Sequence, residues 1–125
     1  MYLYTSYKNK EEVNSTSVKI YFLQIGAYKN TDNVAKMTRL TNYNYVEYDN
    51  GIYYIYIGIT KDEEVLKKLK EIYSSRDIYV KEKEINKKSF IDYLNKYDSM
   101  IKETNDKELI EAIEKDILKK YENSL

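Results

Sequence analysis

The stretch YFLQIGAY, residues 21–28, decides the fold of this chain. It belongs to an apolar run from Val18 to Tyr28 that is rich in β-branched and aromatic residues, and the polar stretch Lys29-Asn30-Thr31-Asp32 follows it directly. Such a run with a polar end is typical of a β-strand that leads into a turn. We therefore expect a strand over residues 18–28 and a change of chain direction immediately after it.

A helix and a β-hairpin are predicted next along the chain. Apolar residues recur at helical spacing up to about Asn42, and Thr31 or Asp32 is suitably placed to cap this helix. The pair Asn50-Gly51 then accommodates the positive φ angles of a tight turn between two strands. The predicted elements are a helix at residues 31–42 and two strands at residues 45–48 and 52–59.

A second helix and a fourth strand complete the pattern. Thr60 or Asp62 caps a helix that carries Val65 and Leu69 on its apolar side, and residues 78–82 form the last predicted strand. The two halves repeat one another, because in both an apolar strand ending in glycine precedes a helix. This duplication predicts an α+β fold of RNP/ferredoxin-like βαββαβ order, with a four-stranded antiparallel sheet and two helices on one face.

The C-terminal part of the chain has a different pattern. Residues 86–125 contain two amphipathic stretches separated by Thr104-Asn105-Asp106, which can cap a helix, and they predict a helical hairpin. In the second stretch, Glu111 and Lys115 have the spacing and polarity of a stabilising ion pair. The predicted division of the chain is a linker or disordered start at residues 1–17, a sheet domain at 18–84 and a C-terminal helical extension at 85–125.

The composition argues against several classes of function. The 125-residue chain has no His and no Cys, so it lacks the commonest general base, thiol nucleophiles and the usual zinc and haem ligands. We therefore expect a protein that is not an enzyme, without catalytic residues, metal or cofactor. Its 21 basic residues balance 21 acidic ones, which argues against nucleic acid as a partner. Residues 1–8 show neither a signal-peptide pattern nor a membrane-spanning run, so we expect no membrane contact in this segment.

The stretch YFLQIGAY, together with the residues after it, resembles the opening signature of SPOR domains, which are bacterial modules that recognise peptidoglycan. That signature is an apolar strand containing Gln, then an apolar residue, Gly, a small residue and an aromatic residue. In the family, a helix carrying Ala and Leu follows this strand. Ala35 and Leu40 stand at the matching positions of this chain.

A second motif extends the resemblance to roughly residues 18–84. The family has a strand of the form Tyr-Arg-apolar-x-apolar-Gly-Pro, which is similar to residues 53–59. This chain departs from it at Tyr54, where the family often has Arg, and at Ile59, where it often has Pro.

The resemblance implies an RNP-like fold whose open sheet face binds septal peptidoglycan, preferentially glycan strands stripped of their stem peptides. It implies a binding module of a bacterial cell-envelope, division or sporulation protein. Such a module would lie outside the cytoplasm, at the septum, and would be held there by an anchor that is not present in this chain.

Strand alternation predicts which residues the open face presents. If Leu23, Ile25 and Ala27 face the helices, the residues between them point to the other side, and the same reasoning applies to the other strands. Aromatic rings offer flat apolar surfaces to the C–H faces of sugars, while amide and hydroxyl groups can bind sugar hydroxyls. The candidate glycan-binding residues are Phe22, Gln24, Tyr45, Tyr54, Tyr56 and Tyr79.

Two alternatives remain open at this point. The apolar sides of the C-terminal helices would bury the aromatic face if they packed on it, since contiguous exposed apolar patches are uncommon. The chain would then be a protein-interaction or oligomerisation module, with a protein partner bound through Leu109, Ile113 and Ile117 of those helices. An RNP-like sheet can also bind RNA, but the neutral charge and the lack of a basic aromatic motif argue against this function.

Overall fold

Strand β1 (Val18–Tyr28) is a central strand of a four-stranded antiparallel sheet in the computed structural model, which describes residues 17–125. The strand order is β2-β3-β1-β4. The other strands are β2 (Tyr45–Asp49), β3 (Ile52–Thr60) and β4 (Tyr79–Ile85). The helices are α2 (Thr31–Thr38), α3 (Glu63–Ile72), α4 (Lys88–Lys102) and α5 (Lys107–Asn123). The prediction of an α+β fold with a four-stranded antiparallel sheet is confirmed. The linker predicted at residues 1–17 lies outside the described residues, except for residue 17.

Side-chain caps set the first residue of three helices. Asp62 accepts hydrogen bonds from two backbone N–H groups in the first turn of α3, and Asp106 does the same for α5. At α2 the capping residue is Asn30, and the prediction of Thr31 or Asp32 was wrong. Asn30 has an extended backbone, and its Oδ1 accepts a hydrogen bond from the N–H of Asp32.

The hairpin turn has the predicted conformation, whereas helix α2 is shorter than predicted. Asn50 and Gly51 both have positive φ angles, 53° and 81°, as the predicted tight turn requires. Helix α2 ends at Thr38, four residues earlier than predicted. Leu40 therefore lies beyond the helix, and its side chain is 64% exposed instead of packed in the core.

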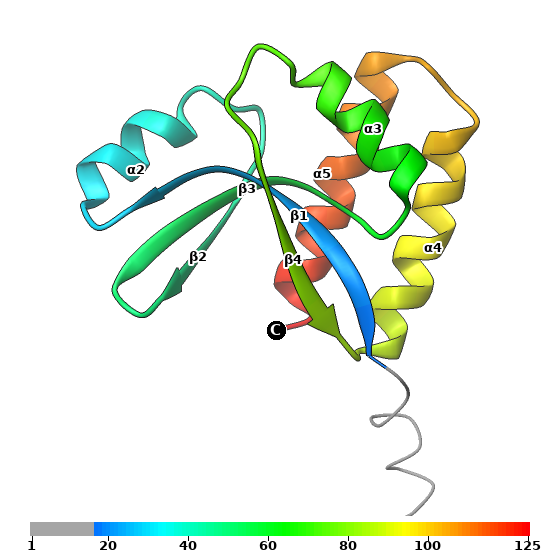
Figure 1. Cartoon of the computed structure of the whole chain (residues 1–125), viewed down its shortest axis with the longest axis horizontal. Coiled ribbons are helices and arrows are strands. Elements are labelled where there is room, and N and C mark those ends of the chain that lie inside the picture. The colour runs from blue at the N-terminus through cyan, green and yellow to red at the C-terminus, as the bar shows by residue number, and fades with distance from the viewer. Residues whose placement is uncertain (1–16) are drawn as a thin grey trace, which may run out of the picture.

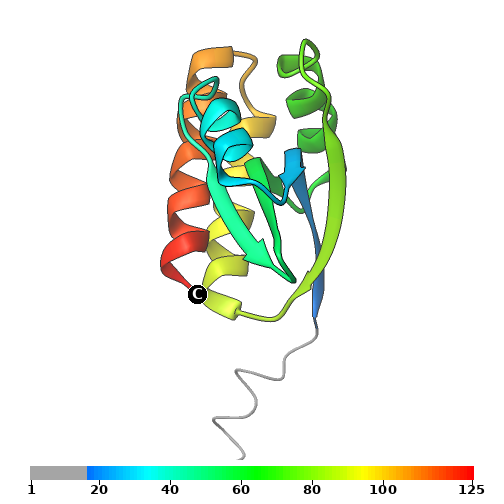
Figure 2. The ribbon, with the colours of Figure 1, turned by 90° about the vertical axis from the view of Figure 1, so that its left-hand side faces the viewer.

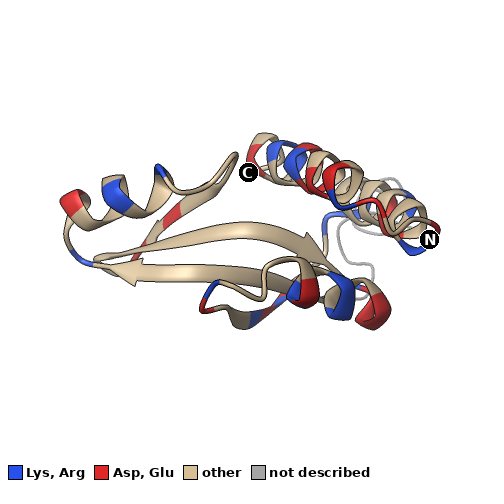
Figure 3. Cartoon of the chain, turned by 90° about the horizontal axis from the view of Figure 1, so that it is seen from above, with Lys and Arg blue, Asp and Glu red and all other residues tan. Residues whose placement is uncertain are grey.

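The helices form layers on the two sides of the sheet. Figure 1 shows α2 and α3 at opposite ends of the sheet, and Figures 2 and 3 show α3 and the α4–α5 hairpin on opposite sides of it. Figure 3 shows charged residues along the helices, whereas the two central strands β1 and β3 are almost uncharged; the edge strand β4 carries four charged residues between Lys81 and Glu84. The predicted C-terminal hairpin is present, and it packs against the sheet and against α3.

One hydrophobic cluster joins the sheet to the C-terminal helices. It includes Leu23 and Ile55 from the sheet, Leu69 from α3, Leu94 from α4 and Ile117 from α5, all without solvent exposure. Burial of one such side chain contributes about 1.5–3 kcal/mol relative to an exposed one. Helices α4 and α5 are therefore part of the same core as the strands.

Two carboxylates of the C-terminal helical hairpin bind backbone N–H groups at the end of β3, beyond the point where its pairing with β2 stops. Pairing between β2 and β3 stops at Tyr56, and the backbone beyond it has no neighbouring strand on that side. There the N–H of Ile59 donates to Oε1 of Glu114 at 2.7 Å, and the N–H of Lys61 donates to Oδ2 of Asp98 at 3.0 Å. These bonds replace strand pairing for one buried and one partly buried N–H group.

Candidate functional site

The predicted site residues lie on one side of the sheet, which we call the tyrosine face. Tyr45, Tyr56, Gln24 and Tyr79 are direct cross-strand neighbours, one from each strand, in the order β2, β3, β1, β4. Residues directly opposite one another in antiparallel strands share a face. Phe22 and Tyr54 precede Gln24 and Tyr56 by two positions and therefore join the same side. The tyrosine face consists of Phe22, Gln24, Tyr45, Tyr54, Tyr56 and Tyr79.

Two β-bulges alter the pattern that simple alternation predicts. Ile25 on β1 and Ile57 on β3 have no partner in the β1–β3 register, so each inserts one extra residue. As a result Ala27 lies opposite Tyr54 and points to the same side of the sheet as the tyrosine face, where it is exposed. The expectation that Ala27 faces the helices was therefore wrong, because the bulge reverses the alternation after Gln24.

Helix α5 covers the half of the tyrosine face that Phe22, Tyr45 and Tyr56 form, and we call it the covered half. Phe22 and Tyr56 are completely buried. The ring of Tyr121 from α5 lies 5.0 Å from the ring of Phe22 and 5.6 Å from that of Tyr45, and Phe90 of α4 packs behind it at 5.3 Å. The expectation of an open face was wrong for this half, because the apolar side of the C-terminal hairpin packs on it.

A polar network closes the covered half on its solvent side. The hydroxyl of Tyr56 donates to Oε1 of Glu47 at 2.8 Å, and Nζ of Lys83 lies 2.7 Å from Oε2 of the same carboxylate. Nζ of Lys83 also lies 4.7 Å from the centre of the Phe22 ring, within the range of a cation–π contact. Burial alone would raise the pKa of Glu47, but the hydrogen bonds from Lys83 and Tyr56 outweigh it and lower that pKa.

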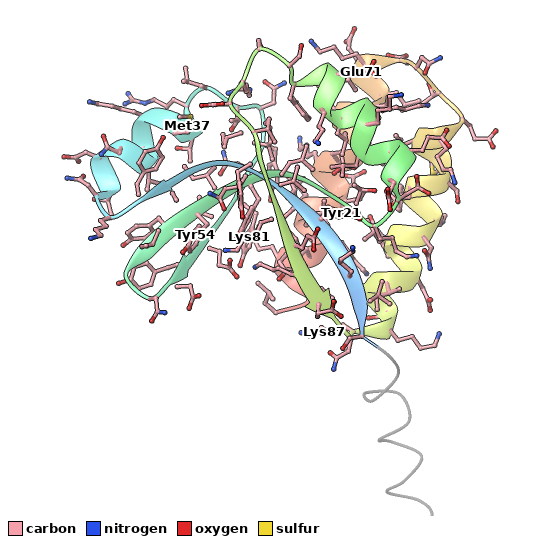
Figure 4. The ribbon with its side chains drawn as sticks, in the orientation of Figure 1. Tyr21, Met37, Tyr54, Glu71, Lys81 and Lys87 are labelled. Carbon is pink, nitrogen blue, oxygen red and sulfur yellow. The ribbon has the colours of Figure 1, made fainter. Side chains whose placement is uncertain are left out.

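The other half of the tyrosine face is accessible, and we call it the open half. Tyr79 is 64% exposed, while Gln24 and Tyr54 are half-buried. Nζ of Lys81 lies 3.7 Å from the centre of the Tyr54 ring, and Figure 4 shows these two side chains next to one another. The open half therefore presents an exposed ring, a second ring under a lysine and an amide.

Sequence reasoning left three contributing residues out of the candidate site. Glu47 and Lys81 point to the same side of the sheet as the tyrosine face, because they follow Tyr45 and Tyr79 by two positions, but neither is among the predicted site residues. Their signal was the same alternation that selected the tyrosines. Tyr121 had no such signal, because its role depends on how α5 packs on the sheet.

Two kinds of feature are absent from the part of the chain that the structure describes, a cluster of metal-ligand side chains and a membrane-spanning helix. Within residues 17–125, no group of three or more acidic, His or Cys side chains is arranged to hold a metal ion. None of the helices in this part of the chain is long and apolar enough to cross a membrane.

Comparison with known proteins gives no relative. No protein-family model matches the chain, and no curated protein or solved structure is significantly similar to it. Function must therefore be inferred from the residues and geometry of this chain.

Proposed function

We propose that the chain is a non-catalytic binding module with a SPOR-like, RNP-like fold, which binds peptidoglycan glycan strands on the open half of the tyrosine face. Gln24, Tyr54 and Tyr79 would contact the sugars, and Lys81 would join them. In this proposal the protein acts in the bacterial cell envelope, in division or sporulation, and is held at the septum by its affinity for glycan.

The exposed ring of Tyr79 beside Gln24 is the observation that carries this proposal. The two residues are cross-strand neighbours on β4 and β1, so a ring and an amide lie side by side on a shallow surface. A sugar can stack its C–H face on the ring while its hydroxyl or acetamido groups bind the amide. A surface without a deep pocket suits an extended polymer.

The position of the Lys81 ammonium group favours a ligand that carries carboxylates. Its ammonium group lies over the ring of Tyr54, so a sugar that stacks on this ring must displace the lysine or bind beside it. Glycan strands without stem peptides have free lactyl carboxylates, and an ammonium group attracts such groups. The departure from the family at Tyr54 is then compensated by a cation from the neighbouring part of the sheet.

Sedimentation with purified peptidoglycan sacculi, before and after amidase treatment, tests the proposal. The native chain should sediment with the sacculi, and more strongly after the treatment. Tyr79→Ala should lower the affinity about two- to tenfold, the range expected for the loss of one aromatic contact.

Tyr48→Ala is the matched control for this experiment. Tyr48 is 63% exposed, close to the exposure of Tyr79, but it lies on the opposite side of the sheet from Glu47 and Tyr45. Its removal should leave sedimentation unchanged. Absence of sedimentation with both preparations would contradict the proposal, as would equal losses for Tyr48→Ala and Tyr79→Ala.

The alternative function, capture of a protein partner through the C-terminal helices, has less support. Ile113 and Ile117 belong to the chain's own hydrophobic cluster, and only Leu109 of the three proposed contacts is exposed, at 45%. A partner would have to displace α5 from the sheet to reach the two isoleucines.

A further inference from the structure

A cleft of about 500 Å³ lies away from the tyrosine face. Its walls are the loop between α2 and β2, the end of α3 with the turn that follows it, and the N-terminal part of α5. These three segments come together at the top of the molecule as drawn in Figure 1. The cleft lies next to the part of β3 that is not paired with β2, beyond the Tyr45–Tyr56 pair.

The floor of the cleft is apolar. Ile57 of β3, Ile72 of α3 and Leu118 of α5 line it, and Ile57 and Leu118 are almost wholly buried. Ligand sites commonly combine such a floor with a few polar groups at the rim. The cleft has the volume for a small organic ligand.

Helix α5 contributes charged side chains of both signs to the rim. Glu111 and Lys115 were predicted to pair with one another, but they form no ion pair within 4 Å, either together or with any other residue of the described chain. The same is true of Lys107 and Glu108, which also line the cleft. The wall formed by α5 therefore offers both carboxylates and ammonium groups to a ligand.

The opposite wall adds a phenol and a fixed guanidinium group. The Tyr73 hydroxyl makes no hydrogen bond to any described residue. Burial, and then the carboxylates of Glu114 and Glu111, raise the pKa of Tyr73, so its hydroxyl stays protonated and able to donate. The guanidinium of Arg76 donates to the backbone carbonyl of Leu40, which ties this wall to the α2–β2 loop.

We propose that this cleft binds a small zwitterionic ligand of the amino-acid or short-peptide class. A ligand of one sign would meet like charges on α5, whereas one with both an ammonium and a carboxylate group can pair with both kinds. The volume suits about two or three amino-acid residues. The assignment is independent of glycan binding, because the cleft and the tyrosine face share no residue.

Titration of the full chain with trialanine, followed by amide chemical shifts, tests this assignment. Shifts should concentrate at residues 40–43, 72–76 and 107–118, and they should saturate. N-acetyl-trialanine amide, which lacks both charged ends, should bind at least tenfold more weakly. Glu111→Gln and Lys115→Gln should each lower the affinity for trialanine about threefold, the scale of a partly exposed ion pair.

Controls separate recognition from a general effect of charge. Lys67→Gln and Glu71→Gln remove an exposed pair with the same spacing on α3, outside the cleft, and should not change the affinity. Tyr73→Phe removes only the hydroxyl and should weaken binding while thermal stability is retained. The assignment is overturned if trialanine causes no shifts in the cleft, if the blocked peptide binds equally well, or if the α3 variants weaken binding as much as the α5 variants.

Discussion

Tyr56 and Tyr54 are two residues apart on β3 and point to the same side of the sheet, yet Tyr56 is wholly buried and Tyr54 is only partly buried. The geometry of the strand gives both side chains the same orientation. The difference arises from α5, whose Tyr121 packs on the covered half and does not extend over the open half. The same residue type therefore contributes to the core in one half of the face and stays partly exposed to solvent in the other.

The largest expected effect comes from truncating one tyrosine in each half. Tyr56→Ala should lower the free energy of unfolding by about 3–5 kcal/mol, because it removes a buried ring and leaves Glu47 without its hydroxyl donor. Tyr54→Ala should cost only about 1 kcal/mol, since its ring is partly solvated. Urea denaturation of both variants measures the difference.

Tyr56→Phe keeps this comparison informative if the alanine variant does not fold. It retains the ring and loses only the hydrogen bond to Glu47, so a loss of about 1–2 kcal/mol is expected. Equal costs for the alanine variants at positions 54 and 56 would show that the two halves of the face are not packed differently.

The next effect concerns the carboxylates that attach the hairpin to β3. Burial raises the pKa of Asp98 to about 6, and burial together with Asp98 raises that of Glu114 well above its usual range. The folded state therefore binds protons more tightly than the unfolded chain does. The contribution of these two groups to stability is fully present below their unfolded pKa values, near 4, and is lost as pH rises through the folded ones. For Asp98 this loss is of order 2–3 kcal/mol between pH 4 and 6.

Urea denaturation at pH 5 and pH 7 tests this dependence. Glu47 and Asp62, whose pKa values are lowered, act in the opposite direction, but only below about pH 4.5. Glu114→Gln keeps an acceptor for the N–H of Ile59 and removes the titrating group, so its stability relative to the native chain should increase with pH. Asp116→Asn, an exposed change on the same helix, should leave the pH dependence intact. A native chain that is more stable at pH 7 than at pH 5 would contradict the prediction.

The smallest expected effect belongs to the ion pair at the border of the covered half. A double-mutant cycle with Glu47→Gln and Lys83→Met should give a coupling of about 1 kcal/mol, because both side chains are largely shielded from water. The exposed pair Lys88–Asp92 is the control, and its coupling should be below about 0.5 kcal/mol. Similar couplings at both sites would mean that the border is as well hydrated as the helix surface.

Local sequence signals predicted most of the elements and most of the face. The Asn50-Gly51 turn, the Asp62 cap and the long apolar run of β1 each depend on a few neighbouring residues, so they could be recognised without tertiary structure. Alternation correctly grouped all six tyrosine-face residues, because a two-residue period survives wherever the strand is regular.

The rest depends on contacts between distant segments. The bulges at Ile25 and Ile57 have no local signature, and the one at Ile25 moved Ala27 to the other side of the sheet. The covered half depends on Tyr121, which lies about a hundred residues after Phe22 in the chain. An amphipathic pattern predicts that α5 has an apolar side, but it does not specify which part of the sheet that side covers.

The bond between Ile59 and Glu114 also affects the order in which the chain can fold during synthesis. Glu114 follows Ile59 by 55 positions, so at typical rates of translation roughly 3–10 s separate their appearance. During that interval the edge of β3 and the rings of Phe22 and Tyr56 have no helix to cover them. The nascent sheet is then a surface on which a ribosome-associated chaperone or another chain can bind, and the emergence of α5 ends this exposure.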